Sequence, residues 1–373
     1  MIIKKKGETM RDFVEINNPY TLQFSYLPPK MIERATVTNE IINNFVRDVP
    51  TYRGIFITGV RGSGKTVMMG EIRNKISSNK NWICVDINPE SNLLDSLARG
   101  LYLIPELKAL FIKAKLDFSI PGIGVHLEKP DIVASNEEDA VRIMLSALKK
   151  AGKKLLVTID EITYSKDVAR FSHALSSFAN AGYEIYVLMT GLADNISNIK
   201  NKKSLTFLYR AKVFMPDSLN ITAIRNDYEK TLGIDREKAE ELAYKTRGYS
   251  LAYQAVGYHC WNELCKSDNY SKVDFEKIDE QLDITLMEMA YDKIWDELSM
   301  TDRSVLEALA RTIDNENSDL IKVENIRNTL NMSSDLFNQY RKRLIDAGII
   351  DGRNYGHVRF CLPRFENYVE NHI

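Results

Sequence analysis

Apolar residues follow two different periods over the first 218 residues of the chain. Short apolar runs predict buried strands at residues 54–58, 82–87, 153–159, 184–190 and 212–215. Between them, apolar residues recur at helical spacing and predict helices at 67–77, 92–100, 137–150 and 168–181. Because strands that alternate with helices build parallel sheets covered on both faces, this part of the chain predicts an α/β fold.

A stretch of alternating apolar and polar residues interrupts this order between Ala114 and Glu128. It surrounds Pro121-Gly122, a pair typical of tight turns, and predicts a β-hairpin inserted into the core. The hairpin is either a device that contacts a partner or an edge feature with no special function.

Beyond Pro216 the pattern becomes helical. Helices are predicted at 221–231, 235–246, 250–265 and 274–298, with Asp235 as an N-cap and Gly248 in a turn. Four aromatic residues at helical spacing either pack in a core or touch a base: Tyr249, Tyr253, Tyr258 and Trp261. The segment predicts a small helical bundle on the α/β core.

The C-terminal part predicts a winged helix-turn-helix outline. Helices at 301–311, 323–330 and 334–347 precede a hairpin that ends in the strand 357–362, and residues 335–347 take the recognition position. Basic residues on this face are Arg341, Lys342, Arg343, Arg353, His357 and Arg359. Since residues 301–373 hold 10 Lys and Arg against 11 Asp and Glu, a net of −1, both DNA and protein stay open as partners.

These elements divide the 373 residues into four parts: a lead-in (1–50), an α/β core (51–218), a helical lid with a connector (219–299) and the winged-helix module (300–373). The 50 basic and 51 acidic residues give a net charge of −1, so the molecule as a whole has no pull toward nucleic acid or an anionic membrane. Four cysteines without a C-x-x-C pair indicate reduced thiols. No run of 18 apolar residues occurs, and no long apolar segment follows the N-terminal lysines, so we expect a soluble, cytoplasmic protein with no membrane partner.

The most specific chemical signal is a phosphate-binding loop directly behind the first predicted strand. It fits the pattern G-x-x-x-x-G-K-[ST], and the predicted helix opens at its end: Gly59, Val60, Arg61, Gly62, Ser63, Gly64, Lys65, Thr66 and Val67. A strand, a glycine-rich turn and a helix aim backbone N–H groups and a positive helix end at a polyphosphate. Lys65 is expected to reach the β- and γ-phosphates of ATP, and the Thr66 hydroxyl to bind Mg²⁺.

A second motif ends the strand 153–159 in two carboxylates, Asp160 and Glu161. The carboxyl end of a parallel strand is where α/β sheets place ligand chemistry. A carboxylate committed to a metal ion loses basicity while its neighbour stays free to accept a proton. We therefore expect Asp160 to hold Mg²⁺ through water and Glu161 to activate the attacking water.

Two further candidates follow. Thr190 ends the strand 184–190 and could bond the γ-phosphate, or it is an ordinary strand-end threonine. Arg210 precedes the last strand and could stabilise charge on the transferred phosphoryl group, in its own subunit or in a neighbour's site. The alternative for Arg210 is a surface salt bridge.

With these motifs in place, the chain resembles bacterial AAA+ ATPases of the origin-recognition-like and STAND-related branch over nearly its whole length. The matching stretches are Asn18–Thr21 with Glu33-Arg34, the loop 59–66, Asp160-Glu161, Thr190–Leu192, Phe207–Ala211, the lid turn Gly248–Ala252 and residues 338–344. The resemblance implies an ATP-bound core, a helical lid and conformational switching driven by hydrolysis. Leu251 stands where many such lids carry an arginine, and Ser250 stands where STAND relatives have proline.

The sequence therefore predicts a slow, Mg²⁺-dependent ATPase that binds ATP and ADP and repositions a winged-helix module. Its partner is double-stranded DNA or a protein, and a nucleotide-dependent homo-oligomer is a further expectation. The alternatives are an ATP-dependent DNA-binding regulator of initiator type and a nucleotide-binding adaptor that does not hydrolyse ATP.

Overall fold

The computed structural model describes residues 18–23, 27–113, 116–118, 132–134, 136–266, 274–316 and 318–372. The chain separates into two compact units. The α/β unit consists of Ala35–Gly59 and Lys65–Pro216. The helical unit consists of the residues up to Arg34, the loop residues Val60–Gly64 and Asp217–Ile373. We call the five residues Val60–Gly64 the loop crest. They are described with the helical unit, to which they belong.

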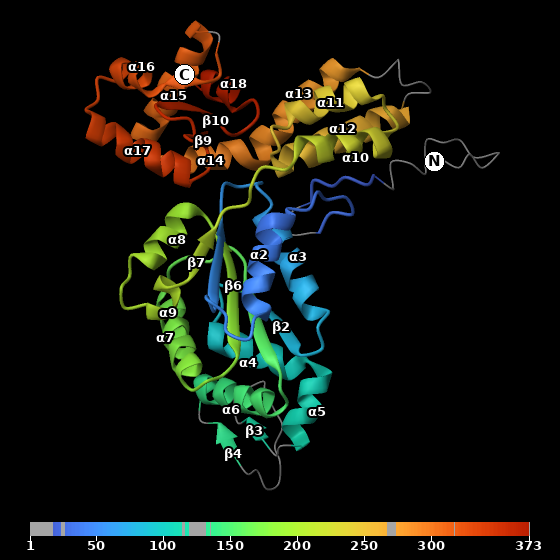
Figure 1. Ribbon diagram of the computed structural model, residues 1–373, viewed down its shortest axis with the longest axis vertical. Helices are drawn as coiled ribbons and strands as arrows, with labels where there is room; N and C mark the ends of the chain where they lie inside the picture. The colour runs from blue at the N-terminus through green and yellow to red at the C-terminus, as the bar shows by residue number, and fades with distance from the viewer. Residues whose placement is uncertain are drawn as a thin grey trace, which may run out of the picture. The chain divides into compact units, whose positions relative to one another are not determined.

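The α/β unit is built on a five-stranded parallel sheet with the strand order β2-β5-β6-β1-β7 (Figure 1). The strands are β1 (Gly54–Thr58), β2 (Trp82–Ile87), β5 (Lys154–Ile159), β6 (Ile185–Gly191) and β7 (Lys212–Phe214). Each lies within one residue of a predicted strand. All carboxyl ends of a parallel sheet lie at one edge, so the residues after β1, β5 and β6 meet there.

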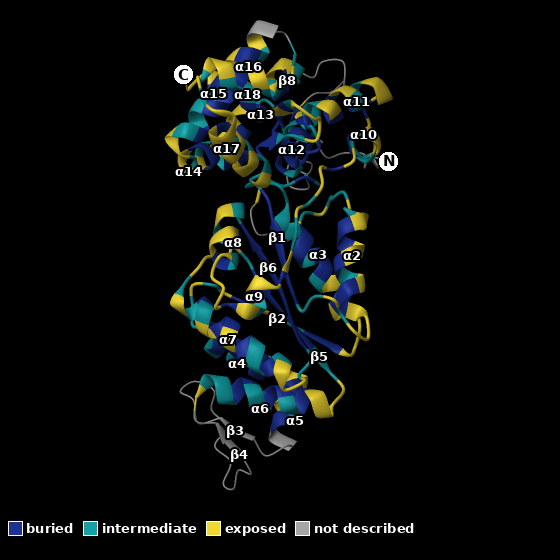
Figure 2. Ribbon diagram, turned by 60° about the vertical axis from the view of Figure 1, so that its left-hand side comes forward, coloured by how far each residue is buried: buried dark blue, intermediate teal, exposed yellow. Residues whose placement is uncertain are grey.

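Helices cover both faces of this sheet. Ile55 and Ile57 of β1 pack with α2 (Ala35–Val46) and α3 (Lys65–Ser77) on one face. Phe56 packs on the other face with a larger apolar cluster. That cluster is supplied by α4 (Leu93–Leu103), α5 (Pro105–Lys113), α6 (Glu137–Lys150), α7 (Lys166–Asn180), α8 (Ala193–Lys200) and α9 (Thr206–Tyr209). The dark blue of β1 and β6 in Figure 2 shows this two-sided burial, which explains why these central strands are apolar at most positions.

The predicted hairpin at 114–128 lies largely outside the described residues, its Pro121-Gly122 turn included. What is described is the strand β3 (Leu116–Phe118), which pairs in parallel with β4 (Ile132–Ala134). A hairpin would pair its two strands antiparallel, so this described pairing is of a different kind from the predicted one.

The helical unit begins with α10 (Ile221–Leu232), α11 (Arg236–Lys245) and α12 (Ser250–Lys266). The predicted N-cap is confirmed, because the Asp235 side chain accepts from the Lys238 N–H. The predicted helix 274–298 is interrupted: α13 (Phe275–Leu286) passes through a π-helical turn, η3 (Met287–Tyr291), into α14 (Asp292–Glu297). The four cysteines are free, and burial raises the pKa of Cys260 to about 12, as expected for a structural thiol.

The lead-in segment is fastened along this bundle. The Tyr20 hydroxyl donates to Asp227 on α10 over 2.7 Å, and the Tyr20 ring packs against Gly257 of α12. Tyr253 donates to the same Asp227 oxygen over 2.8 Å. The side chains of Tyr249 and Tyr253 are buried, so the predicted aromatic series serves largely as core.

The C-terminal part of the helical unit contains α15 (Met300–Glu316), β8 (Ile321–Lys322), α16 (Val323–Thr329), α17 (Ser334–Asp346), β9 (Ile350–Asp351), β10 (His357–Phe360) and α18 (Phe365–Glu370). Strand β10 pairs antiparallel with both β8 and β9. The three predicted helices and the hairpin are present, and α18 is an addition that the sequence analysis lacks.

Candidate nucleotide site

Five residues of the α/β unit at or beyond the carboxyl ends of β1, β5 and β6 are called the strand-end cluster: Lys65, Thr66, Asp160, Glu161 and Thr190. The Thr66 hydroxyl donates to Asp160 Oδ2 over 2.9 Å. The Lys65 ammonium donates to the Gly59 carbonyl over 2.9 Å. Helix α3 begins at Lys65 and has Val67 in its first turn, so the N–H groups of this turn lie at the same sheet edge.

Thr190 joins the two carboxylate residues. Its buried hydroxyl donates to Asp160 Oδ1 and accepts from the Glu161 N–H over 3.0 Å. Its carbonyl accepts from the Ile162 N–H over 2.8 Å. The Thr190 hydroxyl hydrogen therefore points at Asp160, so the described contacts make Thr190 an orienting group for both carboxylate residues.

Glu161 has a strained backbone and an exposed side chain. Its φ angle of 54° lies in the left-handed region, which costs a non-glycine residue about 1–2 kcal/mol. Such strain persists only where surrounding contacts enforce it, and here the bond from the Glu161 N–H to Thr190 does so. Among the described residues the Glu161 carboxylate has no hydrogen-bond partner, so it is available to accept a proton from a water molecule.

Mg²⁺ prefers a few hard oxygen ligands and keeps several waters. Thr66 and Asp160 bring a hydroxyl oxygen and a carboxylate together at the edge where the phosphate-binding loop ends. Both are oxygen donors, so the residues present fit a magnesium ion held by Thr66 directly and by Asp160 through water.

The loop crest is held by side chains and backbone of the helical unit. The carbonyl of Arg61 accepts from the Tyr249 hydroxyl. The carbonyl of Gly62 accepts from the Leu251 N–H over 3.1 Å. The carbonyl of Ser63 accepts from the Ser250 hydroxyl over 3.1 Å and from the guanidinium of Arg34 over 2.9 Å.

Glycine is required at two positions of the crest. Gly62 has φ +72°, and a Cβ there would stand 2.3 Å from the Tyr249 hydroxyl oxygen. Gly64 has φ +85°, and a Cβ would stand 3.0 Å from the Ser250 hydroxyl oxygen. The motif's glycines therefore serve close approach of the turn at 249–251 as well as backbone freedom.

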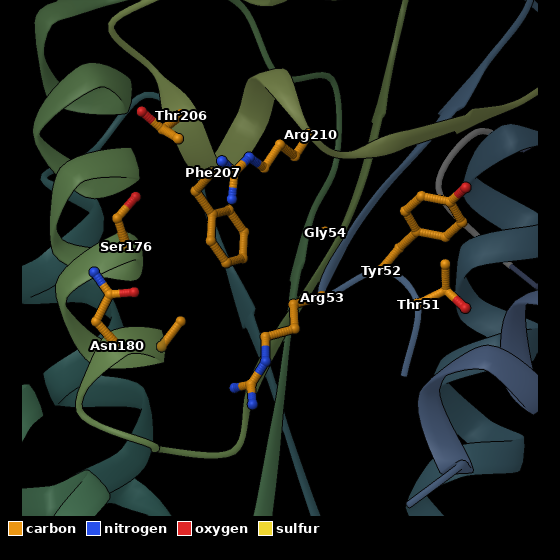
Figure 3. A pocket seen from close by; sticks show the side chains of 10 residues that line it. Thr51, Tyr52, Arg53, Gly54, Ser176, Asn180, Thr206, Phe207 and Arg210 are labelled. Carbon is orange, nitrogen blue, oxygen red and sulfur yellow. The ribbon is translucent and has the colours of Figure 1, made fainter. Parts of the chain in front are cut away.

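Arg210 lies at the opposite edge of the sheet from the strand-end cluster. It follows α9 and precedes β7, and it lines a cavity of about 420 Å³ at the amino end of β1. Figure 3 shows Ser176 and Asn180 extending from α7 at this cavity, with Arg53 beside β1. The four residue steps of β1 separate the two edges by about 13 Å, so this position does not fit action of Arg210 on its own subunit's phosphate-binding loop.

Most basic side chains on the predicted nucleic-acid face are engaged within the chain. Arg343 pairs with Asp302, whose side chain is only 3% exposed. Arg353 and Arg359 both pair with Asp351. The Arg353 guanidinium lowers the pKa of Asp351 to about 2, which shows that this carboxylate is well compensated. This face therefore carries less free positive charge than its sequence suggests.

Sequence reasoning located the turn 248–252 but did not connect it to the loop crest. Three residues with direct contacts to crest carbonyls were missed as site residues: Arg34, Tyr249 and Ser250. A buried tyrosine at helical spacing gives no sign of which carbonyl its hydroxyl bonds. The available signals are the departures from the family pattern at Glu33-Arg34, Ser250 and Leu251.

Comparisons with known proteins agree with this fold. A family model described as a domain of unknown function (DUF8462) matches residues 288–369. No curated protein matches the chain. A Walker-type ATPase of Pyrococcus abyssi is similar in structure, with a TM-score of 0.57 and 14% identity, covering 91% of this chain and 96% of that one. The ORC2 protein of Aeropyrum pernix, in complexes with ADPNP and ADP, has a TM-score of 0.58 and 11% identity, covering 94% and 96%.

The strand order, the parallel pairing and these similarities show the fold of a P-loop ATPase of the AAA+ type, with a C-terminal domain. The origin-recognition-like part of the predicted resemblance is thereby supported at the level of the fold. Both structures come from archaea, so the bacterial and STAND-related parts remain predictions. Among the helices within the described ranges, none combines the length and apolar character that a bilayer crossing needs.

Proposed function

We propose that the chain binds ATP with Mg²⁺ through residues 59–67 and hydrolyses it slowly. The single observation that carries the proposal is the network of Thr66, Asp160, Thr190 and Glu161 at the carboxyl edge of the sheet. The Thr66 hydroxyl and the Asp160 carboxylate pair as a metal site needs, and within the described ranges the Glu161 carboxylate has no hydrogen-bond partner. That division of labour is what phosphoryl transfer to water requires.

Each residue has a distinct task in this proposal. The Lys65 ammonium exchanges its bond to the Gly59 carbonyl for the β- and γ-phosphate oxygens. Thr66 and Asp160 would hold a magnesium ion, which would supply positive charge to neutralise the phosphates. Glu161 accepts a proton from the attacking water, and Thr190 holds Glu161 and Asp160 in place by its two hydrogen bonds.

Two finer features remain part of the proposal. Turnover repositions the C-terminal module, which we interpret as a winged helix that contacts a protein partner. The pairing of Arg343, Arg353 and Arg359 inside the chain favours protein over DNA as that partner. Arg210, which lies away from its own loop, serves a neighbouring copy's nucleotide in a nucleotide-dependent oligomer.

Substitution of the proposed base tests the function. Glu161→Gln keeps the shape of the side chain and removes its basicity, so ATP binding persists while phosphate release falls at least about a hundredfold. Glu106→Gln on α5, an exposed glutamate of the same unit, is the matched control and leaves both unchanged. Phosphate release that survives in Glu161→Gln removes Glu161 from the base role. Adding duplex DNA to the wild-type assay tests the alternative partner, because a regulator of the initiator type responds to it.

A further inference from the structure

The contacts of the loop crest determine where its amide groups point. A trans peptide is planar, so its C=O and the next residue's N–H point in opposite directions. The Arg61 carbonyl is bonded to the Tyr249 hydroxyl, which turns the Gly62 N–H away from Tyr249. In the same way, the bonds from Ser250 and Arg34 to the Ser63 carbonyl turn the Gly64 N–H away from those two residues.

These amides are the groups with which a phosphate-binding loop cradles an anion. The Ser63 N–H makes a long bond of 3.3 Å to the Val60 carbonyl, so the turn at 249–251 mainly orients its neighbours, Gly62 and Gly64. Tyr249 is buried, and burial raises the pKa of its phenol far above the ordinary value. It therefore stays protonated and remains a hydrogen-bond donor at every physiological pH.

The turn that carries these donors is itself anchored to the C-terminal end of the chain. Arg247 donates to the Leu362 carbonyl over 3.1 Å and to both carboxylate oxygens of Glu366, over 3.1 and 2.5 Å. Arg247 has φ 46° and Gly248 has φ +73°, so the turn is held in a conformation that a non-glycine residue rarely adopts. The contacts of Arg247 with α18 hold this strained turn in place.

A second connection runs from the crest in the same direction. The Arg61 guanidinium pairs with Glu297 at the end of α14 over 2.5 Å. The loop crest therefore contacts the rest of its own unit through the Arg61 carbonyl at Tyr249 and also through the Arg61 side chain at Glu297.

We propose that residues 247–251 form a positioning element that orients the phosphate-binding amides of the loop. Because Arg247 in this element bonds to Leu362 and Glu366, the loop's affinity for polyphosphates depends on the contacts of residues 362–366 with the element. Tyr249 and Ser250 are positioning residues that act through crest carbonyls, and Arg247 with Glu366 sets where the turn lies. The inference rests on the proposed function for its consequence, ATP affinity. Its structural content, the orientation of loop amides, is measurable without nucleotide.

Hydrogen exchange of the nucleotide-free protein tests how firmly the turn holds the loop. Tyr249→Phe removes one hydroxyl and keeps the ring, and Glu366→Gln weakens the anchor of Arg247 without touching the loop. Both are expected to speed exchange in a peptide covering 59–67 about three- to tenfold while β5 and β6 keep their protection. The matched controls are the exposed Tyr244→Phe on α11 and Glu370→Gln on α18, which leave the loop unchanged.

ATP titration tests the consequence. Tyr249→Phe is expected to weaken ATP binding about three- to tenfold and Glu366→Gln about two- to fivefold. The double variant is expected to lose less ATP affinity than the product of the two single losses, because both substitutions act through one turn.

If Tyr249→Phe leaves hydrogen exchange of the loop unchanged, the proposed orienting role is wrong. If Tyr249→Phe changes it and Glu366→Gln does not, the coupling to 362–366 is wrong. If the wild type binds no ATP, the proposed function fails, and the exchange result still decides the orienting role.

Discussion

The strand-end cluster of the α/β unit and the loop crest of the helical unit are held by different kinds of contact. In the strand-end cluster, Asp160, Glu161 and Thr190 meet because parallel strands end at one edge, and their mutual bonds are between neighbours in the sheet. In the crest, every donor to a carbonyl of Arg61, Gly62 or Ser63 comes from residues about 30 to 190 positions away, apart from bonds inside the loop.

This difference shows which contacts of a phosphate-binding motif can be predicted from the sequence and which cannot. Strand ends follow from the order of apolar runs, so the chemistry at the sheet edge can be read along the chain. The crest depends on how α12 begins and on where Arg34 lies. Its glycines look like conventional motif residues, yet Gly62 also makes room for the Tyr249 hydroxyl.

The largest effect is expected at Thr190. Thr190→Val keeps the shape of the side chain but removes the bonds to Asp160 and Glu161, leaving the Glu161 N–H without this acceptor and Glu161 free to relax from its strained conformation. We expect turnover to fall about a hundredfold, with a loss of about 1–3 kcal/mol in unfolding free energy from the unpaired group.

Thr158→Val on the adjacent strand β5 is the matched control. Thr158 is equally buried and donates to Asp86, outside the strand-end cluster. A comparable loss of stability with normal turnover in Thr158→Val, measured by denaturant unfolding and phosphate release, separates a catalytic effect from a packing one. Equal turnover in the two variants would show that the strand-end network has no part in catalysis.

The crest is tested by Gly62→Ala against Gly152→Ala. Both glycines have φ near +70°, so both substitutions pay for the left-handed backbone, about 1 kcal/mol each. Only the Cβ at Gly62 meets Tyr249, whereas nothing lies within 4 Å of one at Gly152. We expect ATP affinity, measured by titration, to fall about tenfold in Gly62→Ala alone, since a sub-van der Waals contact costs about 1–3 kcal/mol when its neighbours must shift. Unchanged affinity would place the crest's contacts outside phosphate binding.

The smallest effect concerns a local contact, Asp351 with Arg353. The hydrogen bond from Arg353 lowers the pKa of Asp351 from its ordinary value of 3.8 to about 2. A lowered carboxyl pKa adds stability above about pH 4 that is lost as the pH falls through about 2. Because Arg353 is mostly exposed, we expect Asp351→Asn to cost under about 1 kcal/mol at pH 7. The difference from wild type should shrink as the pH is lowered from about 4 through about 2, and a difference that stays constant over this range would mean that the pair is not the cause.

The central strands β1, β5 and β6 were predictable because each is apolar along most of its length, a pattern typical of a sheet covered on both faces. The short helices α5 and α18, of nine and six residues, escaped prediction, as did α2, α8 and α9. At the site, Lys65, Thr66, Asp160 and Glu161 follow from motif spacing. The roles of Tyr249 and Arg34 cannot be predicted in this way, because both side chains bond to backbone carbonyls. Every residue carries such a carbonyl, so the sequence does not indicate which one is the partner.

The central claim is that residues 59–67 bind a nucleoside triphosphate with magnesium. Calorimetric titration of the wild type and of Lys65→Ala with Mg²⁺-ATP tests it most directly. We expect saturable binding of Mg²⁺-ATP by the wild type. Binding by Lys65→Ala should be at least about a hundredfold weaker, because this substitution removes the ammonium that contacts the β- and γ-phosphates. Equal affinity in the two proteins, or a wild type that takes up no ATP, would contradict it.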